Sequence, residues 1–279
     1  MSPLQRDRER YAEQMMLGIE VDTRRLREAF AGTPREDFVG PPPWPLLGHA
    51  IGRLWTDDVR ELYQDVLVGL DVERGINNGQ PSLHARGLAA CDPRPGDTVL
   101  HVGAGTGYYT AILARLVETD GTVIAYEIES DLAARAAVNL KPWPQASVRA
   151  VSGAAPPLPA CDVVYVSAGA THPLAAWLDA LRDGGRLVFP LTPDDGTGCM
   201  LLVTRLRGER YAARSLMRVS FIACVGARDA AASAALRRAF ALGPVEAVRS
   251  LHRDARPDDS AWCAGPDWWL STRPPDAAA

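Results

Sequence analysis

The chain has 279 residues, 47% hydrophobic and 23% charged, so it can bury a core and lacks the composition of a disordered chain. Its 30 basic and 34 acidic residues leave a net charge of −4, which gives no bulk positive field to attract nucleic acid or an anionic membrane. Lys141 is the only lysine, and Pro142 follows it. This excludes pyridoxal-type enzymes that need a Schiff-base lysine and ATPases with a Gly-Lys-Ser/Thr phosphate loop.

The five cysteines are dispersed and form no Cys-x-x-Cys pair, a pattern typical of reduced thiols in a cytoplasmic protein, and we predict no metal site. The segment 1–14 is charged and lacks the apolar core of a signal peptide. No uncharged apolar run approaches the roughly 18–20 residues that span a bilayer. We therefore expect a cytoplasmic protein that binds neither nucleic acid nor membrane; its oligomeric state is left open.

The N-terminal sixty or so residues are expected to be helical and then extended. Apolar residues at helical spacing predict helices over 7–19 and 23–30. The proline-rich run 41–45 forbids helix and predicts a stiff, extended connector.

From residue 98 onward, short apolar runs alternate with helical segments, which predicts parallel βαβ units with helices on both faces. The expected strands are 98–102, 122–128, 147–151, 162–166 and 186–190, and the expected helices are 108–117, 132–139 and 175–182. Two strand-like segments, 200–206 and 211–221, then predict an antiparallel edge. The last segment offers a helix over 230–242, a strand over 245–252 and an end rich in tryptophan.

The fold class that follows is α/β. We predict a Rossmann-like, doubly wound, mostly parallel seven-stranded sheet with one antiparallel edge strand. A helical N-terminal region and a small C-terminal extension complete it.

The sharpest motif is the glycine-rich turn between the strand 98–102 and the helix 108–117. Gly103, Gly105 and Gly107 let the backbone turn tightly and let a ligand approach bare main chain at a helix N-terminus. Their Gly-x-Gly-x-Gly spacing differs from the Gly-x-Gly-x-x-Gly of dinucleotide sites. It favours a ligand without a pyrophosphate, such as S-adenosylmethionine. The alternative is a turn that only packs helix on strand.

Glu127 lies twenty residues after Gly107, at the end of the next predicted strand. A carboxylate at this position can accept hydrogen bonds from both ribose hydroxyls. Glu129 competes for that role, but it lies beyond the strand, where capping of the next helix explains it. We therefore predict that Glu127, and not Glu129, binds the ribose hydroxyls of the cofactor.

Several segments between about residues 25 and 225 together resemble the protein-L-isoaspartate O-methyltransferase family of class I S-adenosylmethionine-dependent enzymes. The most particular are Pro34–Val39, which reads Pro-Arg-Glu-Asp-Phe-Val, and Gln80-Pro81. Others are Tyr63–Asp65, Pro95–Leu100, Asp162–Ala168, Leu181–Pro190 and Val219–Phe221.

The resemblance implies transfer of a methyl group from S-adenosylmethionine to a carboxylate, as in L-isoaspartyl residues of proteins or peptides, with S-adenosylhomocysteine as product. It implies a methyltransferase domain over 61–226, between an N-terminal region 1–60 and an extension 227–279 packed on the domain. The residues expected beside the acceptor are Gly79, Gln80, Pro81, Ser82 and His84. The expected cofactor site comprises His101, Gly103, Ala104, Gly105, Thr106, Gly107, Tyr108, Glu127, Ile128, Ser152 and Gly153.

Three positions depart from the family pattern. Gly79 stands where the family has a serine that touches the substrate carboxylate, so we expect weak isoaspartyl activity that Gly79→Ser raises, unless Ser82 supplies the hydroxyl. His101 replaces an acidic residue and either holds water around the methionine amine or is a buried, hydrogen-bonded histidine. Ser152 and Gly153 stand where the family has an Asp-Gly pair that contacts the adenine amine. Either backbone groups or the Ser152 side chain would then bind the adenine.

Other functions stay open at this point. Gly79 and the fifty or so C-terminal residues favour a methyltransferase of the same fold that acts on a small metabolite or a dedicated precursor peptide. The acceptor is therefore a protein, a peptide or a small molecule. The intact set of Gly103, Gly105, Gly107 and Glu127 argues against a degenerate module that binds the cofactor, or nothing, and acts as a partner domain. The glycine spacing argues against a nicotinamide oxidoreductase. His172 follows the strand 162–166 and is expected to face the crevice in which the cofactor and the acceptor would bind.

Overall fold

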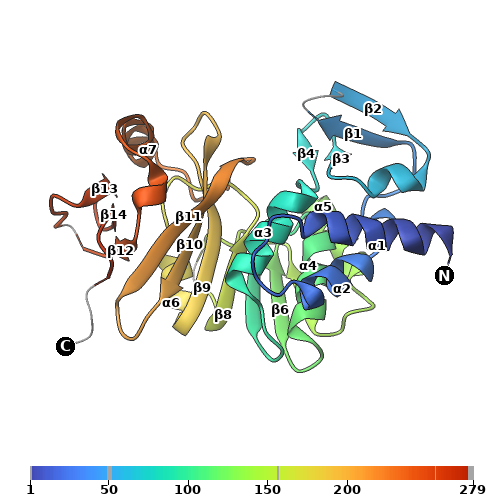
Figure 1. Cartoon of the computed structure of the whole chain (residues 1–279), viewed down its shortest axis with the longest axis horizontal. Helices are drawn as coiled ribbons and strands as arrows, with labels where there is room; N and C mark the ends of the chain where they lie inside the picture. Colours follow the sequence, from blue (N-terminus) through green and yellow to red (C-terminus); the bar gives the residue numbers. More distant parts are fainter. Residues whose placement is uncertain (1, 49–51, 156, 255, 276–279) are drawn as a thin grey trace. The chain divides into compact units, whose positions relative to one another are not determined.

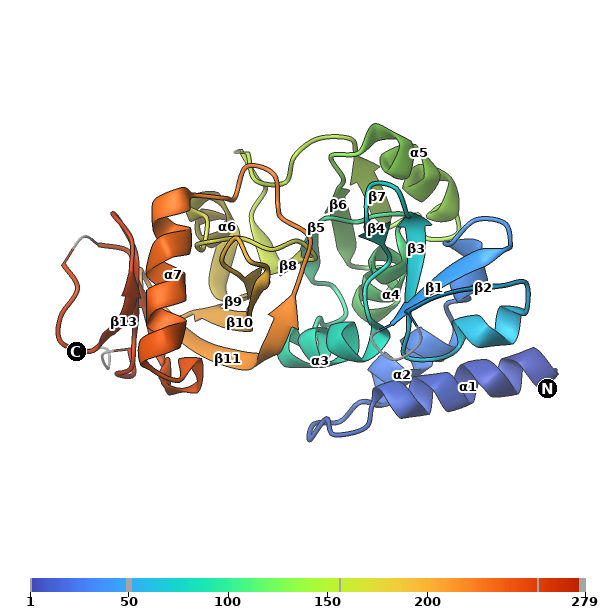
Figure 2. The same cartoon turned by 90° about the horizontal axis from the view of Figure 1, so that it is seen from above.

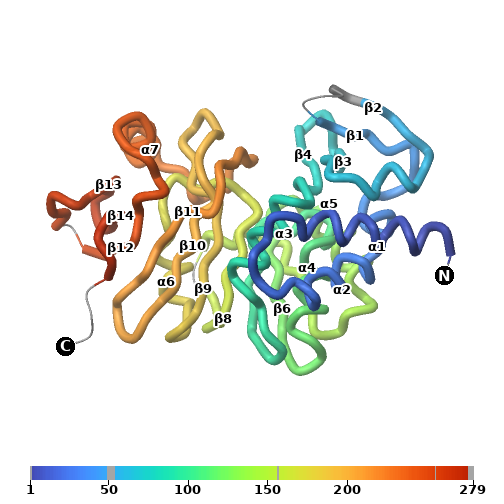
Figure 3. The backbone as a smooth tube through the Cα atoms, in the orientation of Figure 1, coloured from blue at the N-terminus to red at the C-terminus, as the bar shows by residue number. Residues whose placement is uncertain are grey.

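The computed structural model describes residues 2–48, 52–155, 157–254 and 256–275. The chain forms two compact units, which the backbone trace lets the reader follow along the sequence (Figure 3). The first unit comprises Met1–Asp97 and Ala104–Val151, and the second comprises Thr98–Gly103 and Ser152–Ala279. The glycine loop therefore contributes residues to both units.

The first unit contains the helices α1 to α5, which Figure 1 labels. Buried aromatic side chains form its core. The longest helix, α1, starts with Pro3 behind the N-cap Ser2, whose hydroxyl accepts a hydrogen bond from the Gln5 N–H. The rings of Tyr11, Phe30 and Phe38 are buried and pack on one another or on Tyr108. The elements are α1 (Pro3–Met15), α2 (Arg24–Ala31), η1 (Arg35–Asp37), η2 (Val59–Leu62), α3 (Pro81–Cys91), α4 (Tyr108–Val117) and α5 (Ser130–Asn139).

A small antiparallel sheet also belongs to this unit, with strand order β2-β1-β3-β4 (Figure 2). Its strands are β1 (Trp44–Gly48), β2 (Gly52–Thr56), β3 (Leu67–Asp71) and β4 (Ile76–Asn77). Trp44, Leu46 and Val68 bury one face against Val39 and Leu62. The sequence predicted only an extended connector here, because strands this short show little alternation. Two parallel strands complete the unit: β6 (Thr122–Tyr126) and β7 (Ala146–Arg149).

The second unit is built on a mixed sheet with strand order β13-β14-β12-β11-β10-β9-β8-β5. Strands β5, β8 and β9 are parallel, and every pairing from β9 to β13 is antiparallel. The strands are β5 (Thr98–Val102), β8 (Cys161–Val166), β9 (Leu181–Leu191), β10 (Thr197–Arg205), β11 (Tyr211–Ser220), β12 (Ser250–His252), β13 (Ala261–Ala264) and β14 (Trp269–Ser271). The helices are α6 (Ala175–Ala180), α7 (Ala230–Leu242) and η3 (Val245–Ala247).

The mixed α/β fold is the one predicted from the sequence, and β5, α4 and α7 have the predicted bounds. The antiparallel part extends beyond a single edge strand, because β12 and β14 continue it past β11. The expected strand 245–252 is wrong over its first half, where Pro244 precedes the 3-10 turn η3. The segment 79–84 carries the residues expected beside the acceptor and is named the acceptor segment. It is helical from Pro81, which occupies the first turn of α3.

In the part of the chain that the structure describes, no helix combines the length and apolar character needed to cross a membrane. All five cysteines are buried.

The division into the regions 1–60, 61–226 and 227–279 stays a prediction. Residues 1, 49–51, 255 and 276–279 of the outer regions lie outside the described residues. Within the second unit, Tyr211 of β11 pairs with Leu251 of β12, and the Ala213 N–H of β11 donates to the Arg249 carbonyl at 2.9 Å. These bonds link the extension to the edge of the sheet.

We expect deletion of residues 227–279 to give insoluble or destabilised protein. The deletion uncovers the edge of β11 and the apolar surface that Leu236, Leu251 and Leu270 cover while fully buried. Soluble yield and the thermal melting temperature measure the effect. A soluble truncated protein that melts at the wild-type temperature would contradict this expectation.

Candidate functional site

The turn between β5 and α4 depends on glycines with left-handed backbone angles. Gly105 has φ +56° and Gly107 has φ +94°, values that L side chains rarely adopt. A Cβ on Gly107 would lie 3.2 Å from Leu140 Cγ, so glycine there lets α4 approach the end of α5. Around Gly105, Leu70 Cδ1 at 3.5 Å is the one described atom within 4 Å of a Cβ position. The main chain at Gly105 is therefore open to a ligand.

Glu127 is anchored to this turn through both carboxylate oxygens. The Gly105 N–H donates to Oε2 at 2.7 Å, and the Glu129 N–H donates to Oε1 at 3.0 Å. The residue is 6% exposed, and burial raises the pKa of its carboxyl against the opposing effect of these backbone N–H groups. The Ile128 N–H also acts on this carboxylate and favours its charged form. Of the four lone pairs of the two oxygens, one is left for a ligand.

The other side chains of the turn point into the protein. Ala104, Thr106 and Tyr108 are buried. The Tyr108 ring packs edge-on against Phe30 and Phe38 in the aromatic core. Their side chains are therefore not available to a ligand at the turn, which leaves only their backbone groups for the predicted cofactor site. Ile128, in contrast, is a large apolar side chain that is 44% exposed beside Glu127.

Glu129 has a different role from Glu127. It is the N-cap residue of α5, but its side chain makes no capping hydrogen bond. Its carboxylate lies 2.6 Å from Arg74, which also pairs with Asp71 and Asp131 at 2.7 Å each. Glu129 therefore belongs to an exposed ion-pair network that ties the turn after β3 to the start of α5.

His101 lies in β5 of the second unit and is fully buried. Its Nε2 lies 3.0 Å from Ser167 Oγ, and burial lowers the pKa of the imidazole to about 3. The ring is therefore neutral at neutral pH. This geometry favours the buried, hydrogen-bonded role over direct contact with a ligand.

Ser152 and Gly153 are held in a turn of the second unit. The Ser152 hydroxyl accepts from the Ala154 N–H at 3.2 Å and donates to the Val225 carbonyl at 3.4 Å. The Gly153 carbonyl accepts from the Trp177 indole at 2.9 Å. The structure thus gives both residues a role in fixing the turn.

The acceptor segment of the first unit is organised by Asp65. The Gln80 side-chain amide donates to Asp65 at 2.8 Å, and the Ser82 hydroxyl donates at 2.6 Å. The Ser82 N–H also donates to Asp65 at 2.8 Å, so this carboxylate caps the start of α3. Because Ser82 donates its only hydroxyl proton to Asp65, the geometry does not favour Ser82 as a substitute donor to a substrate carboxylate.

Gly79 packs against His84 and is hydrogen-bonded to Tyr109. Gly79 has φ +76°, and a Cβ there would lie 2.2 Å from His84 Nε2. The His84 ring is buried and stacks on Tyr109 with 3.7 Å between ring centroids. The Tyr109 hydroxyl donates to the Gly79 carbonyl at 3.3 Å. A serine at position 79 would meet the His84 ring, which gives a physical reason to expect that Gly79→Ser does not raise the activity.

Sequence reasoning missed two residues that position the acceptor segment, Asp65 and Arg35. Arg35 is fully buried and donates to the carbonyls of Leu62, Gln64 and Val66, which hold the stretch that carries Asp65. The signal was present, since Arg35 and Asp65 both belong to segments that resemble the family. Their function depends on contacts that spacing cannot show.

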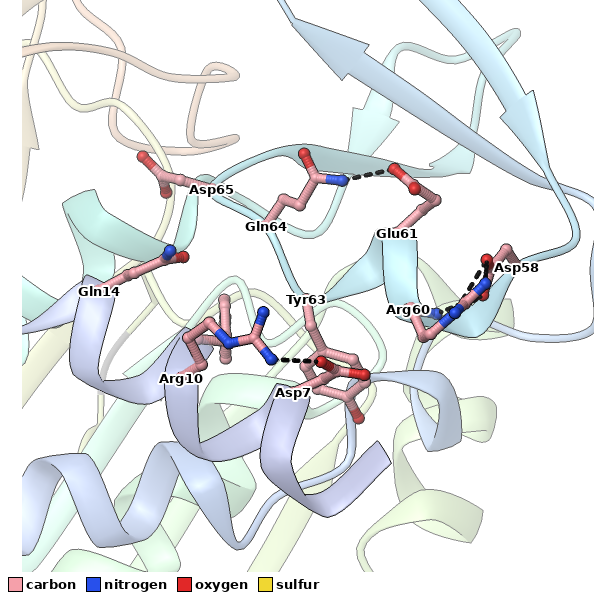
Figure 4. A pocket seen from close by; sticks show the side chains of 10 residues that line it. Asp7, Arg10, Gln14, Asp58, Arg60, Glu61, Tyr63, Gln64 and Asp65 are labelled. Carbon is pink, nitrogen blue, oxygen red and sulfur yellow. Dashed lines mark hydrogen bonds and ion pairs between the residues drawn. The ribbon is translucent and has the colours of Figure 1, made fainter. Parts of the chain in front are cut away.

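A polar pocket of about 660 Å³ opens beside Asp65 (Figure 4). Its arginines are engaged within the wall, because Arg10 pairs with Asp7 and Arg60 pairs with Asp58. The lining residues come from α1 and from the stretch through η2 to Asp65: Asp7, Arg10, Tyr11, Gln14, Asp58, Arg60, Glu61, Tyr63, Gln64 and Asp65. Four of these side chains are carboxylates and two are arginines, so the wall carries more negative than positive groups.

Comparisons with known proteins agree on one family. The sequence model of protein-L-isoaspartate(D-aspartate) O-methyltransferase matches residues 15–229. The protein-L-isoaspartate O-methyltransferase of Methanopyrus kandleri is 33% identical over 67% of this chain and 77% of its own length. The protein of the same name from Aeropyrum pernix is 31% identical over 80% of this chain and 81% of its own length.

Solved structures show the same fold. A protein-L-isoaspartate O-methyltransferase superposes with a TM-score of 0.67 at 18% identity, covering 97% of this chain and 88% of its own. A Plasmodium falciparum beta-aspartate methyltransferase, solved with S-adenosyl-L-homocysteine, superposes with a TM-score of 0.62 at 18% identity, covering 78% of this chain and 98% of its own. The chain belongs to the protein-L-isoaspartate(D-aspartate) O-methyltransferase family.

Proposed function

We propose that this protein is an S-adenosylmethionine-dependent methyltransferase that methylates the free carboxylate of L-isoaspartyl residues in proteins or peptides. The observation that carries the proposal is the family match over residues 15–229, which includes both the glycine loop and the acceptor segment. The relatives' names do not favour the small-metabolite or precursor-peptide alternative. Absence of nucleic-acid and membrane partners and a cytoplasmic location stay predictions from the sequence.

Residues of the first unit fit the cofactor. S-adenosylmethionine supplies an electrophilic methyl group when bound. Glu127 has an acceptor position left for a ribose hydroxyl, and the open main chain at Gly105 admits close approach. The exposed Ile128 side chain offers an apolar surface for a flat ring. Glu129 is committed to Arg74 and is not assigned to the cofactor.

The chemistry requires alignment more than proton transfer. A carboxylate acceptor is already ionised and nucleophilic at neutral pH, so no general base is needed. The chain's residues must bind and orient the acceptor and exclude water, which contributes up to about 7–11 kcal/mol in favourable cases. This agrees with the geometry of Gln80 and Ser82, whose polar groups hold the acceptor segment in place through Asp65.

The polar pocket beside Asp65 supports a peptide acceptor. Its volume of about 660 Å³ accommodates several residues next to the modified one. Its carboxylate and amide lining suits the N–H groups and basic side chains of a peptide. We assign this pocket to the flanking residues of the substrate.

We expect Glu127→Ala to weaken S-adenosylmethionine binding by about 1.5–3 kcal/mol, the cost of losing hydrogen bonds to a charged group. Calorimetric titration measures the dissociation constant. Glu129→Ala is the matched control and should leave the affinity unchanged, because Glu129 pairs with Arg74. If the wild type and Glu127→Ala bound S-adenosylmethionine with equal affinity, Glu127 would not be the residue that binds the ribose.

The acceptor is tested by transfer of labelled methyl from S-adenosylmethionine to an isoaspartyl peptide and to its aspartyl counterpart. We expect label in the isoaspartyl peptide alone. The label should be lost on mild alkaline treatment, as a methyl ester is. Tight cofactor binding without transfer to the isoaspartyl peptide would instead support the metabolite or precursor-peptide reading.

We expect Gly79→Ser to lower kcat/KM for the isoaspartyl peptide by at least about tenfold, because the new Cβ meets the His84 ring and the backbone is strained. Gly75→Ser is the matched control, since Gly75 also has a positive φ of +70° but no described atom within 4 Å of a Cβ.

The double variant Gly79→Ser/His84→Ala should recover part of the lost activity, because it empties the space that the serine enters. If Gly79→Ser alone raised the activity above the wild type, the steric account of residue 79 would be wrong.

A further inference from the structure

The polar pocket beside Asp65 lies between two walls, both of which belong to the first unit (Figure 4). One wall is the stretch from Asp58 to Asp65, which lies inside the family match. The other wall is α1, which ends at Met15, the residue where the family match begins. The family match therefore assigns no role to the α1 wall. The acceptor segment belongs to the same unit as the pocket.

The α1 wall is fixed by contacts with the opposite stretch and with η1. Tyr11 is buried, and its ring packs edge-on against Tyr63 with 5.6 Å between centroids. Arg8 donates to the Tyr63 hydroxyl at 2.8 Å and pairs with Glu36. These contacts set the spacing of the two walls. Substitutions of exposed side chains on α1 should therefore leave the pocket in place.

The charges of the pocket do not balance. Each of its two arginines pairs with an aspartate of the same wall, so these pairs contribute no net charge. The carboxylates of Glu61 and Asp65 make no ion pair with any residue that the structure describes. Neutral groups donate to them instead, namely the Gln64 amide to Glu61 and groups of the acceptor segment to Asp65. Two uncompensated negative charges therefore line the pocket and attract a cation.

Amide side chains line the pocket on both walls. Gln14 comes from α1, and Gln64 comes from the opposite stretch (Figure 4). The Gln14 side chain is exposed and makes no hydrogen bond with any residue in the described part of the chain. An amide offers one acceptor oxygen and two N–H donors, which match the C=O and N–H groups of a peptide backbone. Gln14 can therefore bind main chain while the carboxylates bind a basic side chain.

We propose that this pocket selects acceptor peptides that carry a lysine or arginine next to the isoaspartyl residue, and that Glu61 and Gln14 are specificity-determining residues. The inference rests on the proposed function, because it takes residues 79–84 as the acceptor segment. Asp65 connects the two sites, since it lines the pocket and accepts three hydrogen bonds from the acceptor segment. The basic side chain lies between Glu61 and Asp65, and Gln14 bonds the peptide backbone from α1.

The size of the preference follows from the exposure of the pocket. One solvent-exposed ion pair changes an equilibrium constant by at most about fivefold. Two carboxylates that attract a lysine and repel a glutamate should therefore separate the two peptides by about tenfold. Such exposed charges are screened at high salt, where the Debye length falls to about 3 Å in 1 M salt. The preference should then largely disappear.

The first test uses the wild-type, full-length protein at saturating S-adenosylmethionine. Its substrates are isoaspartyl peptides that differ only in the residue before or after the isoaspartyl residue, which is lysine, glutamine or glutamate. We expect KM for the lysine peptide to be about tenfold below KM for the glutamate peptide, with similar kcat values. In about 1 M salt the two KM values should converge.

The second test changes single charges of the pocket. Glu61→Gln keeps the size of the side chain and should raise KM for the lysine peptide about threefold, while KM for the glutamine peptide stays unchanged. Gln14→Lys places a positive charge on the α1 wall and should abolish the preference for lysine. The matched controls are Glu28→Gln on α2 and Gln5→Lys on α1, which change the net charge equally but do not line the pocket. Both controls should keep the wild-type KM values.

The other outcomes count against the inference. If the wild type methylates the three peptides with equal KM, the pocket does not select a basic residue and the inference alone is refuted. An unchanged lysine-peptide KM in Glu61→Gln overturns the role of Glu61, and equal effects of Gln14→Lys and Gln5→Lys overturn the role of the α1 wall. A wild-type protein that binds S-adenosylmethionine but methylates none of the isoaspartyl peptides refutes the proposed function and the inference with it.

Discussion

The buried guanidinium of Arg35 is the interaction on which the acceptor side of the first unit depends. Burying such a cation costs several kcal/mol, and hydrogen bonds and ring faces must offset that cost. Here the carbonyls of Leu62, Gln64 and Val66 accept its N–H groups, and the rings of Tyr11 and Tyr108 lie within 6 Å of its charge, at 5.6 and 5.8 Å. Asp65 lies within this anchored stretch, so the cap that it provides to α3 is fixed by Arg35.

A feature of the site was predictable from the sequence when its contacts join residues that are close along the chain. The glycine turn and the strand that ends near Glu127 are local features, and hydrophobic periodicity located them to within a few residues. The sheet β1–β4 escaped prediction because its strands are short and follow a proline run. The role of Asp65 escaped because its partners lie 15 and 17 residues away, across a sheet and a turn.

Position 79 shows where resemblance alone misleads. The family has a serine at the position of Gly79, so the sequence comparison suggests only that a hydroxyl has been lost there. In the structure the space that its side chain would fill is taken by His84, and Tyr109 holds both the His84 ring and the Gly79 carbonyl. A single sequence does not show that Gly79 has a left-handed backbone angle, nor that the ring five residues later fills the space beside it. The missing side chain is therefore part of a different packing solution at the same turn.

The charged groups of the site share a task that suits the proposed chemistry. Glu127 accepts from two backbone N–H groups, Asp65 from the start of α3, and Arg35 donates to three carbonyls, so each of them fixes main chain. Methyl transfer to an ionised carboxylate needs reacting groups held in line and sheltered from water, and it needs no shared proton. A site suited to that reaction uses its charged side chains to hold turns and helix starts in place. This explains why the informative motifs of the chain are glycines, prolines and caps, and why no acid–base pair stood out among them.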